Sequence, residues 1–307
     1  MPNRNDVRNP LRIFDPRAVR QHRVRAASRG GAEFLFIESA EQLADRLADV
    51  NRSFPRALDL GCRDGLLGRH LAGRFGIEWL VSADPALAFA RKAPAPRLVA
   101  DAEALPFAGG AFDLVVSNLA LHWTNDLPGA LLQLRHALKP DGLLLASVCG
   151  GETLTELRQA LIEAESEVEG GASPRVSPFA DARDLAALLQ RAGFALPVVD
   201  SDIIEATYLD ALSLMRDLRH MGESNALTLR RREFTGRATL LRAAAIYQSR
   251  FARADGRIPA RFEIVTLTAW APHQSQPRPL RPGSAEARLA DALRTREHKA
   301  GDKTPPR

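Results

Sequence analysis

The most constraining feature of the sequence is the stretch from 58 to 71, LDLGCRDGLLGRHL. An apolar run leads into Asp59 and a turn that contains Gly61 and Gly65, and the residues after the turn read as the start of a helix. A strand that passes through a glycine turn into a helix is the unit with which α/β proteins hold nucleotide-like ligands. The stretch therefore predicts an α/β domain with a ligand site at this turn.

The chain around this stretch alternates between apolar runs and helical patterns. We expect strands at 57–61, 77–83, 97–100, 112–118 and 142–149, and helices near 33–50, 65–74, 85–92 and 126–138. Short apolar runs separated by helices or crossovers indicate a parallel sheet that is covered on both faces. The expected fold is a doubly wound, Rossmann-like α/β core over 33–150.

The pattern changes after residue 150. We expect helices at 152–169 and 181–192 with a loop at 170–179 between them, then strands near 194–207 and 261–270 separated by helices near 209–221 and 230–252. Residues 151–272 would complete the sheet and carry a helical cap inserted late in the chain. A basic lead at 1–32 and a basic, disordered tail at 273–307 would flank these parts.

Composition limits the function classes. Apolar residues make up 45% and charged residues 26%, which is typical of a soluble globular protein, and no apolar run is long enough to span a bilayer. The N-terminus has no apolar signal-peptide region, so we expect a cytoplasmic protein.

The net charge of +5 arises at the two ends of the chain. The first part carries Arg4, Arg8, Arg12, Arg17, Arg20, Arg23, Arg25 and Arg29. Solvated termini explain these arginines best; the alternative is docking onto an acidic partner or an anionic membrane surface. Because no aromatic residues are interleaved with a basic stripe, we expect no nucleic-acid partner.

The chain has two cysteines, Cys62 and Cys149, each at the end of an expected strand. The usual doubly wound order places another strand between these two, which separates them by about 10 Å, beyond disulfide reach. Neither has a Cys or His neighbour at ligand spacing, so we expect free thiols and no metal site.

The glycine turn favours one cofactor class over another. A dinucleotide fingerprint starting at Gly61 needs glycines at 63 and 66, where Arg63 and Leu66 stand. The template acid-x-Gly-x-Gly-x-Gly is met at Asp59, Gly61 and Gly65 and fails only at Arg63. This template suits S-adenosylmethionine, whose ammonium, or a bound water, the acid can orient while the glycines let the backbone approach.

Two further acids follow neighbouring strands. Asp84 ends the second strand, where a carboxylate can accept both ribose hydroxyls, and Asp101 follows the third, where it can accept from the adenine amino group. Three acids at three strand ends favour cofactor binding over helix capping. Arg63 either crowds the cofactor, folds outward if its φ is negative, or attracts a carboxylate.

Several motifs resemble those of class I S-adenosylmethionine-dependent methyltransferases: ALDLGCRDG, ADP, ADAEALPF and FDLVVSNLALHWTNDLPGAL. They are most similar to the branch that contains the malonyl-carrier-protein O-methyltransferases of biotin synthesis and the respiratory complex I assembly factor 5 family. The motifs GGETLTELRQAL, LRHMGESNA and AWAPHQSQPRPLRPGSA resemble the assembly-factor family specifically. The resemblance covers residues 10–285 and implies hydroxylation of an arginine on an iron–sulfur subunit of complex I.

The resemblance also implies site residues. Those for the cofactor are Asp59, Gly61, Cys62, Arg63, Gly65, Asp84, Pro85, Asp101, Ala102, Ser117, Asn118 and Leu119. Those for the substrate are His122, Trp123, Met221, Glu223 and Asn225, with His122 as the candidate catalytic residue. Members of the family usually have glycine where Arg63 stands.

Three functions follow as alternatives. The protein modifies an arginine of a complex I subunit, peripheral to the inner membrane; it methylates a small or carrier-bound acid; or it is a non-catalytic chaperone. Methyl transfer mainly needs alignment of acceptor and methyl group. Hydroxylation needs an oxidant and often iron, yet the seven histidines form no His-x-Asp pair typical of an iron site.

Overall fold

The computed structural model describes residues 12–277 and 289–295. Contacts divide the chain into two units, 1–272 and 273–307, and the description below concerns the first. The predicted disordered tail lies largely outside the described residues; its described part includes the short helix α10 (Leu289–Ala292). Arg4 and Arg8 of the basic lead also lie outside the described residues.

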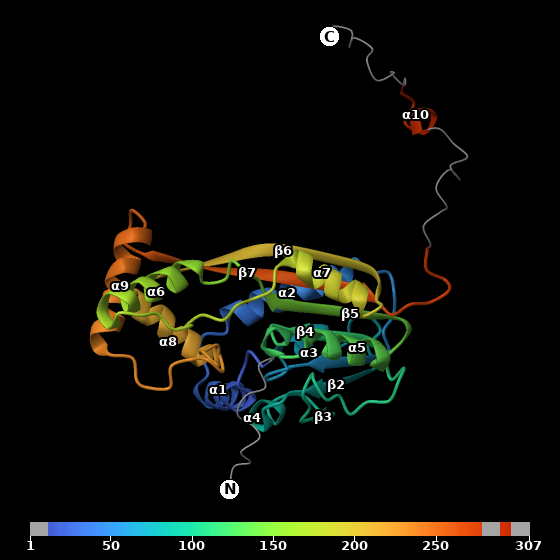
Figure 1. Ribbon diagram of the computed structural model, residues 1–307. Coiled ribbons are helices and arrows are strands. Elements are labelled where there is room, and N and C mark those ends of the chain that lie inside the picture. Colours follow the sequence, from blue (N-terminus) through green and yellow to red (C-terminus); the bar gives the residue numbers. More distant parts are fainter. Residues whose placement is uncertain (1–11, 278–288, 296–307) are drawn as a thin grey trace. The chain divides into compact units, whose positions relative to one another are not determined.

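A seven-stranded sheet forms the core of the first unit (Figure 1), in the order β3-β2-β1-β4-β5-β7-β6. The strands are β1 (Arg56–Leu60), β2 (Trp79–Ala83), β3 (Arg97–Leu98), β4 (Phe112–Asn118), β5 (Leu138–Cys149), β6 (Ala195–Tyr208) and β7 (Ile258–Trp270). Strand β7 runs antiparallel to both its neighbours, and the other pairs are parallel. The predicted Rossmann-like sheet is confirmed, with a shorter third strand than expected.

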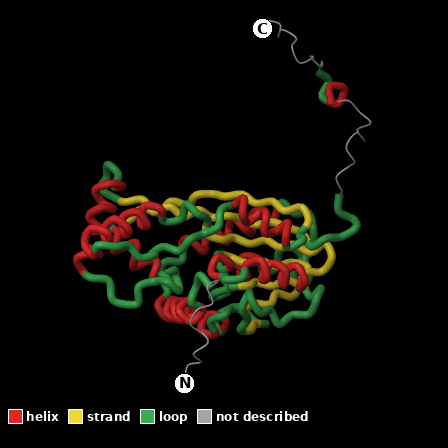
Figure 2. The backbone as a smooth tube through the Cα atoms, in the orientation of Figure 1, coloured by secondary structure: helices red, strands yellow, loops and turns green. Residues whose placement is uncertain are grey.

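Helices cover both faces of the sheet, as Figure 2 shows. Helices α2 (Phe34–Ala48) and α3 (Leu66–Leu71) pack on one face, and α5 (Leu127–Ala137) and α7 (Ala182–Arg191) pack on the other. Fully buried leucines fill the layers, among them Leu43 and Leu47 on the first face and Leu131 and Leu189 on the second. Each such side chain contributes about 1.5–3 kcal/mol of burial free energy.

The helical cap is built on strands longer than the rest of the sheet. Strands β6 and β7 stay paired as far as Tyr208 and Ile258, beyond the other strands. Helices α8 (Ala211–Met221) and α9 (Arg237–Phe251) are inserted between them, and α6 (Thr155–Glu169) packs against α9. The prediction of a cap inserted late in the chain is confirmed, and its core includes Tyr247, Leu214 and Phe262.

The second half of the N-terminal lead is a helix, and the prediction of solvated arginines holds there for all but Arg23. Residues Pro16–Arg29 form helix α1, whose first turn is capped by the Asp15 carboxylate and has proline at its first position. Helix α1 packs against α4 (Leu87–Ala90) and α8, and its Arg23 is only 3% exposed. The helix is difficult to predict because its buried residues include small alanines such as Ala26 and Ala27, which give little apolar pattern among the arginines.

Two further observations bear on the expectations from sequence. Within 12–277 and 289–295, no helix has both the length and the apolar character required to traverse a bilayer. Cys62 follows β1 and Cys149 ends β5, and both are buried free thiols, as predicted; β4 lies between these two strands.

Candidate functional site

Two cavities lie at the carboxyl edge of the sheet, and Gly61 lines both. The first, here the turn cavity, brings together the predicted residues Asp59, Gly61, Cys62, Arg63 and Asn118. The second, here the α1 cavity, lies against helix α1 and brings together Gly61, Pro85, Asp101, Ala102 and Trp123. Most of the predicted cofactor residues therefore line one continuous edge of the sheet.

The glycines of the turn are required by its backbone. Gly61 has φ +73°, and a Cβ there would lie 2.2 Å from the Cβ of Ala120. Gly65 has φ +84° and directly precedes α3, where a Cβ would lie 2.4 Å from Pro94. Side chains at both positions would strain the backbone and collide with neighbours, so the glycines hold the turn close to the strand ends. Gly65 itself does not line either cavity.

Asp59 is the acid with free hydrogen-bonding capacity. Its side chain, on β1, is 0% exposed, and neither carboxylate oxygen has a hydrogen-bond partner among the residues described. Burial raises the pKa of Asp59 to about 7, although the nearby backbone N–H of Gly68 acts to lower it. A buried carboxylate with so little compensation, at the wall of a cavity, is a site that a cationic group can satisfy.

Asp84, in contrast, is already saturated. Its Oδ1 accepts from Arg23 Nε at 3.3 Å and from the Ala86 N–H at 2.8 Å. Its Oδ2 accepts from Arg23 Nη2 and from the Arg63 backbone N–H, the latter at 3.0 Å. The predicted binding of ribose hydroxyls by Asp84 therefore requires Arg23 of α1 to release at least one oxygen.

Arg63 has a conformation that the sequence analysis did not expect. Its φ is +53°, so the alternative in which a negative φ lets the Arg63 side chain point out of the cavity is wrong. The guanidinium Cζ lies 3.7 Å from the centre of the Phe36 ring and 4.5 Å from that of Phe89. Nη1 donates to the Met221 carbonyl at 2.9 Å, which ties the turn to the end of α8. Burial, reinforced by the charge of Arg23, lowers the pKa of Arg63 to about 10.

The end of β4 supplies a buried polar segment. Asn118 donates from Nδ2 to the Phe36 carbonyl at 2.9 Å and accepts from Ser147 Oγ at 3.1 Å. Ser117 is buried, and its Oγ has no partner among the described residues. Leu119 has φ +48°, and its N–H donates to the Ser147 carbonyl at 3.0 Å. Of the three, only Asn118 lines a cavity next to the glycine turn.

His122, Trp123 and Glu223 meet between the α1 cavity and the cap. Glu223 Oε2 accepts from Trp123 Nε1 at 2.8 Å and lies 3.2 Å from His122 Nε2. Burial alone would raise the pKa of Glu223, but the hydrogen bond and charge of His122, with the charges of Arg63 and Arg23, lower it. His122 Nδ1 is buried and has no partner among the described residues. Glu223 is therefore a carboxylate, held in place by two ring nitrogens.

A third cavity, of about 260 Å³, lies under the cap. Its wall is mainly apolar, with Leu157, Phe179 and Met215, and it includes Trp123, Glu223 and Asn225 among the predicted substrate residues. Met221 is fully buried and contributes its carbonyl rather than its side chain to the site. The cavity has the composition of a small-molecule or side-chain pocket: apolar walls and few polar groups.

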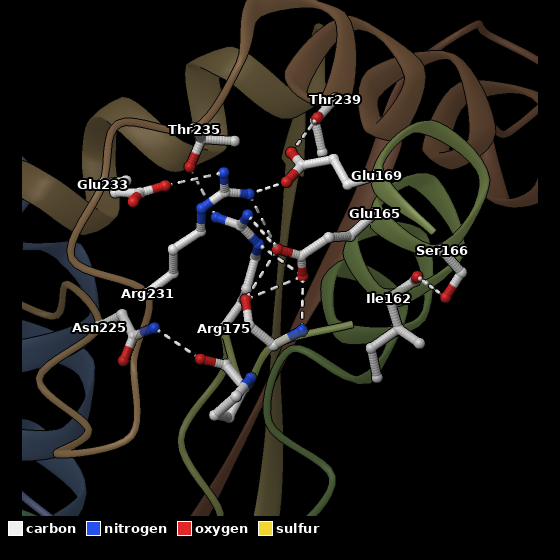
Figure 3. A network of polar contacts seen from close by, with 12 residues as sticks. Ile162, Glu165, Ser166, Glu169, Arg175, Asn225, Arg231, Glu233, Thr235 and Thr239 are labelled. Carbon is white, nitrogen blue, oxygen red and sulfur yellow. Dashed lines mark hydrogen bonds and ion pairs between the residues drawn. The ribbon is translucent and has the colours of Figure 1, made fainter. Parts of the chain in front are cut away.

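Ion pairs hold the loop that closes this cap cavity (Figure 3). Glu165 of α6 accepts from Arg175 Nη2 at 2.6 Å and from the Ser173 N–H at 2.7 Å. Asn225 donates to the Pro174 carbonyl at 2.8 Å and accepts from the Leu227 N–H. Asn225 thus positions the loop at 170–179. Arg175 lines the cap cavity and is at the same time paired with Glu165.

The residues present fit S-adenosylmethionine. Asp59 offers two unpartnered carboxylate oxygens toward an ammonium, and Gly61 leaves the backbone free where a side chain would collide. The α1 cavity has Pro85, Asp101 and Leu121 on its wall, which suit a flat adenine ring with an amino group. Asp84 must exchange a hydrogen bond from Arg23 for one from a ribose hydroxyl.

Comparison with known proteins decides the family. Residues 32–197 match the model of the methyltransferase domain. The chain belongs to the class I S-adenosylmethionine-dependent methyltransferase superfamily. The YcgJ protein of Bacillus subtilis shares the fold, with a TM-score of 0.53 at 13% identity over 76% of this chain and 99% of that chain. The cofactor of this superfamily member is S-adenosylmethionine, as predicted.

Relatives of this methyltransferase-family chain divide into two groups. The chain is 41% identical over 92% of its length to the arginine-hydroxylase NDUFAF5 of Danio rerio, covering 90% of that protein, and 42% identical over 90% of its length to that of Homo sapiens, covering 81%. It is 36% identical to the malonyl-[acyl-carrier protein] O-methyltransferase of Methylovorus, over 85% of this chain and 90% of that protein. Both predicted resemblances are confirmed.

Sequence reasoning missed residues that complete the site of this superfamily member. Arg23, Phe36 and Phe89 lie 20 or more residues from the glycine turn in sequence, and no motif marks them. The one available indication was Asp15 followed by Pro16, which marks a helix start. In the part of the chain that the structure describes, no three His, Cys, Asp or Glu side chains gather as a metal-ligand set.

Proposed function

We propose that this protein is an assembly factor of respiratory complex I that modifies an arginine side chain of one of its iron–sulfur subunits. The observation that carries the proposal is the extent of the similarity to the arginine-hydroxylases. Identity of 41–42% extends over 90–92% of the chain and so includes the cap as well as the cofactor core. We expect the cap to select the acceptor, because function depends on the site rather than on the shared fold.

Glu223 supports an arginine as the acceptor. A guanidinium donates charge-assisted hydrogen bonds to a carboxylate oxygen, and an apolar wall strengthens them by excluding water. Glu223 lines the apolar cap cavity, uses only Oε2 in the hydrogen bonds to His122 and Trp123, and is ionised by its surroundings. Oε1 is left to receive a guanidinium.

The chemistry separates two forms of the proposal. S-adenosylmethionine, when bound, supplies an activated methyl group. Hydroxylation instead inserts one oxygen atom into a C–H bond. With molecular oxygen as the external oxidant, the second oxygen atom leaves as water, which takes two protons and two electrons from a separate reductant. In either case Glu223 and the cap would hold the guanidinium, and His122 would position Glu223 through the contact between Nε2 and Oε2.

Mass spectrometry of complex I tests the function. We expect an arginine of an iron–sulfur subunit to carry one added oxygen atom in the wild-type strain and to lack it in a deletion strain. An added methyl group would show transfer chemistry on the same residue. A wild-type subunit with every arginine unmodified would contradict enzymatic action, and if the deletion also blocked assembly, it would favour a chaperone.

A variant of Glu223 tests the acceptor site separately. We expect Glu223→Gln to lower the modified fraction by a factor of about 10–100, because a charged hydrogen bond is worth roughly 1.5–3 kcal/mol. Its affinity for S-adenosylmethionine should stay within about twofold, since this change leaves Asp59 and the glycine turn in place. Arg175→Gln serves as the control for a loosened cap loop. If the Glu223→Gln variant modified the target arginine fully, Glu223 would not be the residue that binds the acceptor.

Cytoplasmic location and peripheral association with the inner membrane belong to this proposal. Arginines of α1 that remain exposed, such as Arg20 and Arg25, supply positive charge for an anionic surface.

A further inference from the structure

We propose that Arg63 binds the carboxylate at the amino acid end of S-adenosylmethionine. The inference rests on the cofactor and does not depend on which acceptor the cap selects. It gives a function to the one residue that departs from the acid-x-Gly-x-Gly-x-Gly template of the turn.

The guanidinium of Arg63 has unused donors. Nη1 donates to the Met221 carbonyl at 2.9 Å, while Nε and Nη2 make no hydrogen bond within the described part of the chain. No carboxylate among the described residues lies within ion-pair distance of Arg63, although the residue is only 9% exposed. The neighbouring Arg23, by comparison, is fully engaged with Asp84. Carboxylates such as Glu223 act on Arg63 only from beyond contact distance, and a buried guanidinium with no carboxylate in direct contact is costly unless a ligand supplies one.

Phe36 and Phe89 fix the position of this free charge. Their rings lie 3.7 and 4.5 Å from Cζ, and both residues line the turn cavity together with Arg63. Cation–π contact of this kind holds a guanidinium without using its N–H groups. The N–H groups of Arg63 thus remain available to a ligand in the turn cavity.

Of the charged side chains that line the turn cavity, Asp59 and Arg63 are the two that are buried. Asp59 offers two unpartnered oxygens, and Arg63 offers Nε and Nη2. An α-amino acid carries one ammonium and one carboxylate on the same carbon. The pair therefore matches the zwitterionic end of the cofactor, with Asp59 toward the ammonium and Arg63 toward the carboxylate.

The backbone of the turn supports the same assignment. Arg63 has a left-handed φ of +53°, a backbone conformation that glycine adopts without strain. Its N–H donates to Asp84 Oδ2 at 3.0 Å. The turn therefore presents a charged side chain to the cavity from a backbone conformation suited to glycine.

Calorimetric titration with two ligands tests the proposal. We expect the full chain to bind S-adenosylmethionine about 10- to 100-fold more tightly than decarboxylated S-adenosylmethionine, which lacks only the carboxylate. In Arg63→Gln, affinity for S-adenosylmethionine should fall by a similar factor, and affinity for the decarboxylated compound should change less than about twofold. Arg63→Lys should retain part of the preference.

Arg91→Gln is the matched control, because it removes an exposed arginine next to α4 that lines neither cavity. It should leave both affinities unchanged. Tighter binding of S-adenosylmethionine by Arg63→Gln would show that Arg63 obstructs the cavity and would overturn the proposal. Equal affinity of the unsubstituted protein for the two ligands would overturn it as well, without reliance on any variant folding.

Discussion

Asp59 links the site to the pH dependence of folding. Its pKa in the folded protein, raised by burial to about 7, lies above the ordinary value of 3.8 for an aspartate side chain. The folded state therefore holds this proton more tightly than the unfolded chain does, so stability from this residue is present in acid and is lost as pH rises from about 4 to 7. The loss is on the order of 3–5 kcal/mol.

We expect Asp59→Asn to remove that loss. Denaturant unfolding at several pH values should show the variant gaining stability relative to the wild type as pH rises from about 4 to 7, with a constant difference above pH ~7. Affinity for S-adenosylmethionine should fall, because the ammonium loses its carboxylate. A difference between the two proteins that does not change with pH would mean that Asp59 ionises freely in the folded protein.

For single residues, the sequence predicts which residues lie at the site better than it predicts their conformations and hydrogen-bond partners. Asp59, Gly61 and Asp101 could be placed at one edge because each follows an apolar strand, and strand ends of a parallel sheet share an edge. The sign of φ at Arg63 and the pairing of Asp84 with Arg23 could not be predicted. Both depend on contacts between residues 61 to 158 positions apart, which no local pattern encodes.

Helix α1 is the element that most changes the site. It carries Arg23 to Asp84 and forms one wall of the α1 cavity with Pro16 and Val19. Two independent contacts, the Asp15 N–H to the Ala226 carbonyl at 2.8 Å and the edge-on packing of Phe14 against Trp123, hold its start on the cap and on the 120–125 segment. The helix thus covers the site from outside the sheet.

The buried pair between α1 and β2 gives a prediction for the docking of this helix. Arg23→Met keeps the aliphatic stem but leaves Asp84 buried without its cation, so we expect a loss of about 3–5 kcal/mol in the free energy of unfolding. The double variant Arg23→Met with Asp84→Asn should recover at least half of that loss. Chemical denaturation of both proteins measures the two values. Additive losses in the double variant would show that the two side chains are not coupled.

Some helices and strands could be predicted from the sequence and others could not, and the difference has physical causes. Strands β1, β2 and β4 and helices α2, α5 and α7 have strong apolar periodicity, which fixes their type. Helix α1 was missed because its buried face consists of alanines and one arginine, which carry little hydrophobic contrast. Strand β3 is two residues shorter than predicted, because Val99 and Ala100 follow it outside the ladder.

In the first unit as a whole, a shared core is joined to a selective cap. The turn and α1 cavities belong to the core, and the cap cavity belongs to the part that α6, α8 and α9 build. Arg63 and Glu223 connect the two, since Arg63 bonds the end of α8 and Glu223 follows two residues later. Cofactor and acceptor would therefore meet where α8 approaches the carboxyl edge of the sheet.

A crystal structure of the protein with S-adenosylhomocysteine tests this arrangement most directly. We expect the adenine between α1 and the Pro85–Asp101 wall, and the amino acid end in the turn cavity, with its ammonium within hydrogen-bond distance of Asp59. Density for the nucleoside away from this edge, or a turn cavity still closed by the Arg63 side chain, would contradict the account.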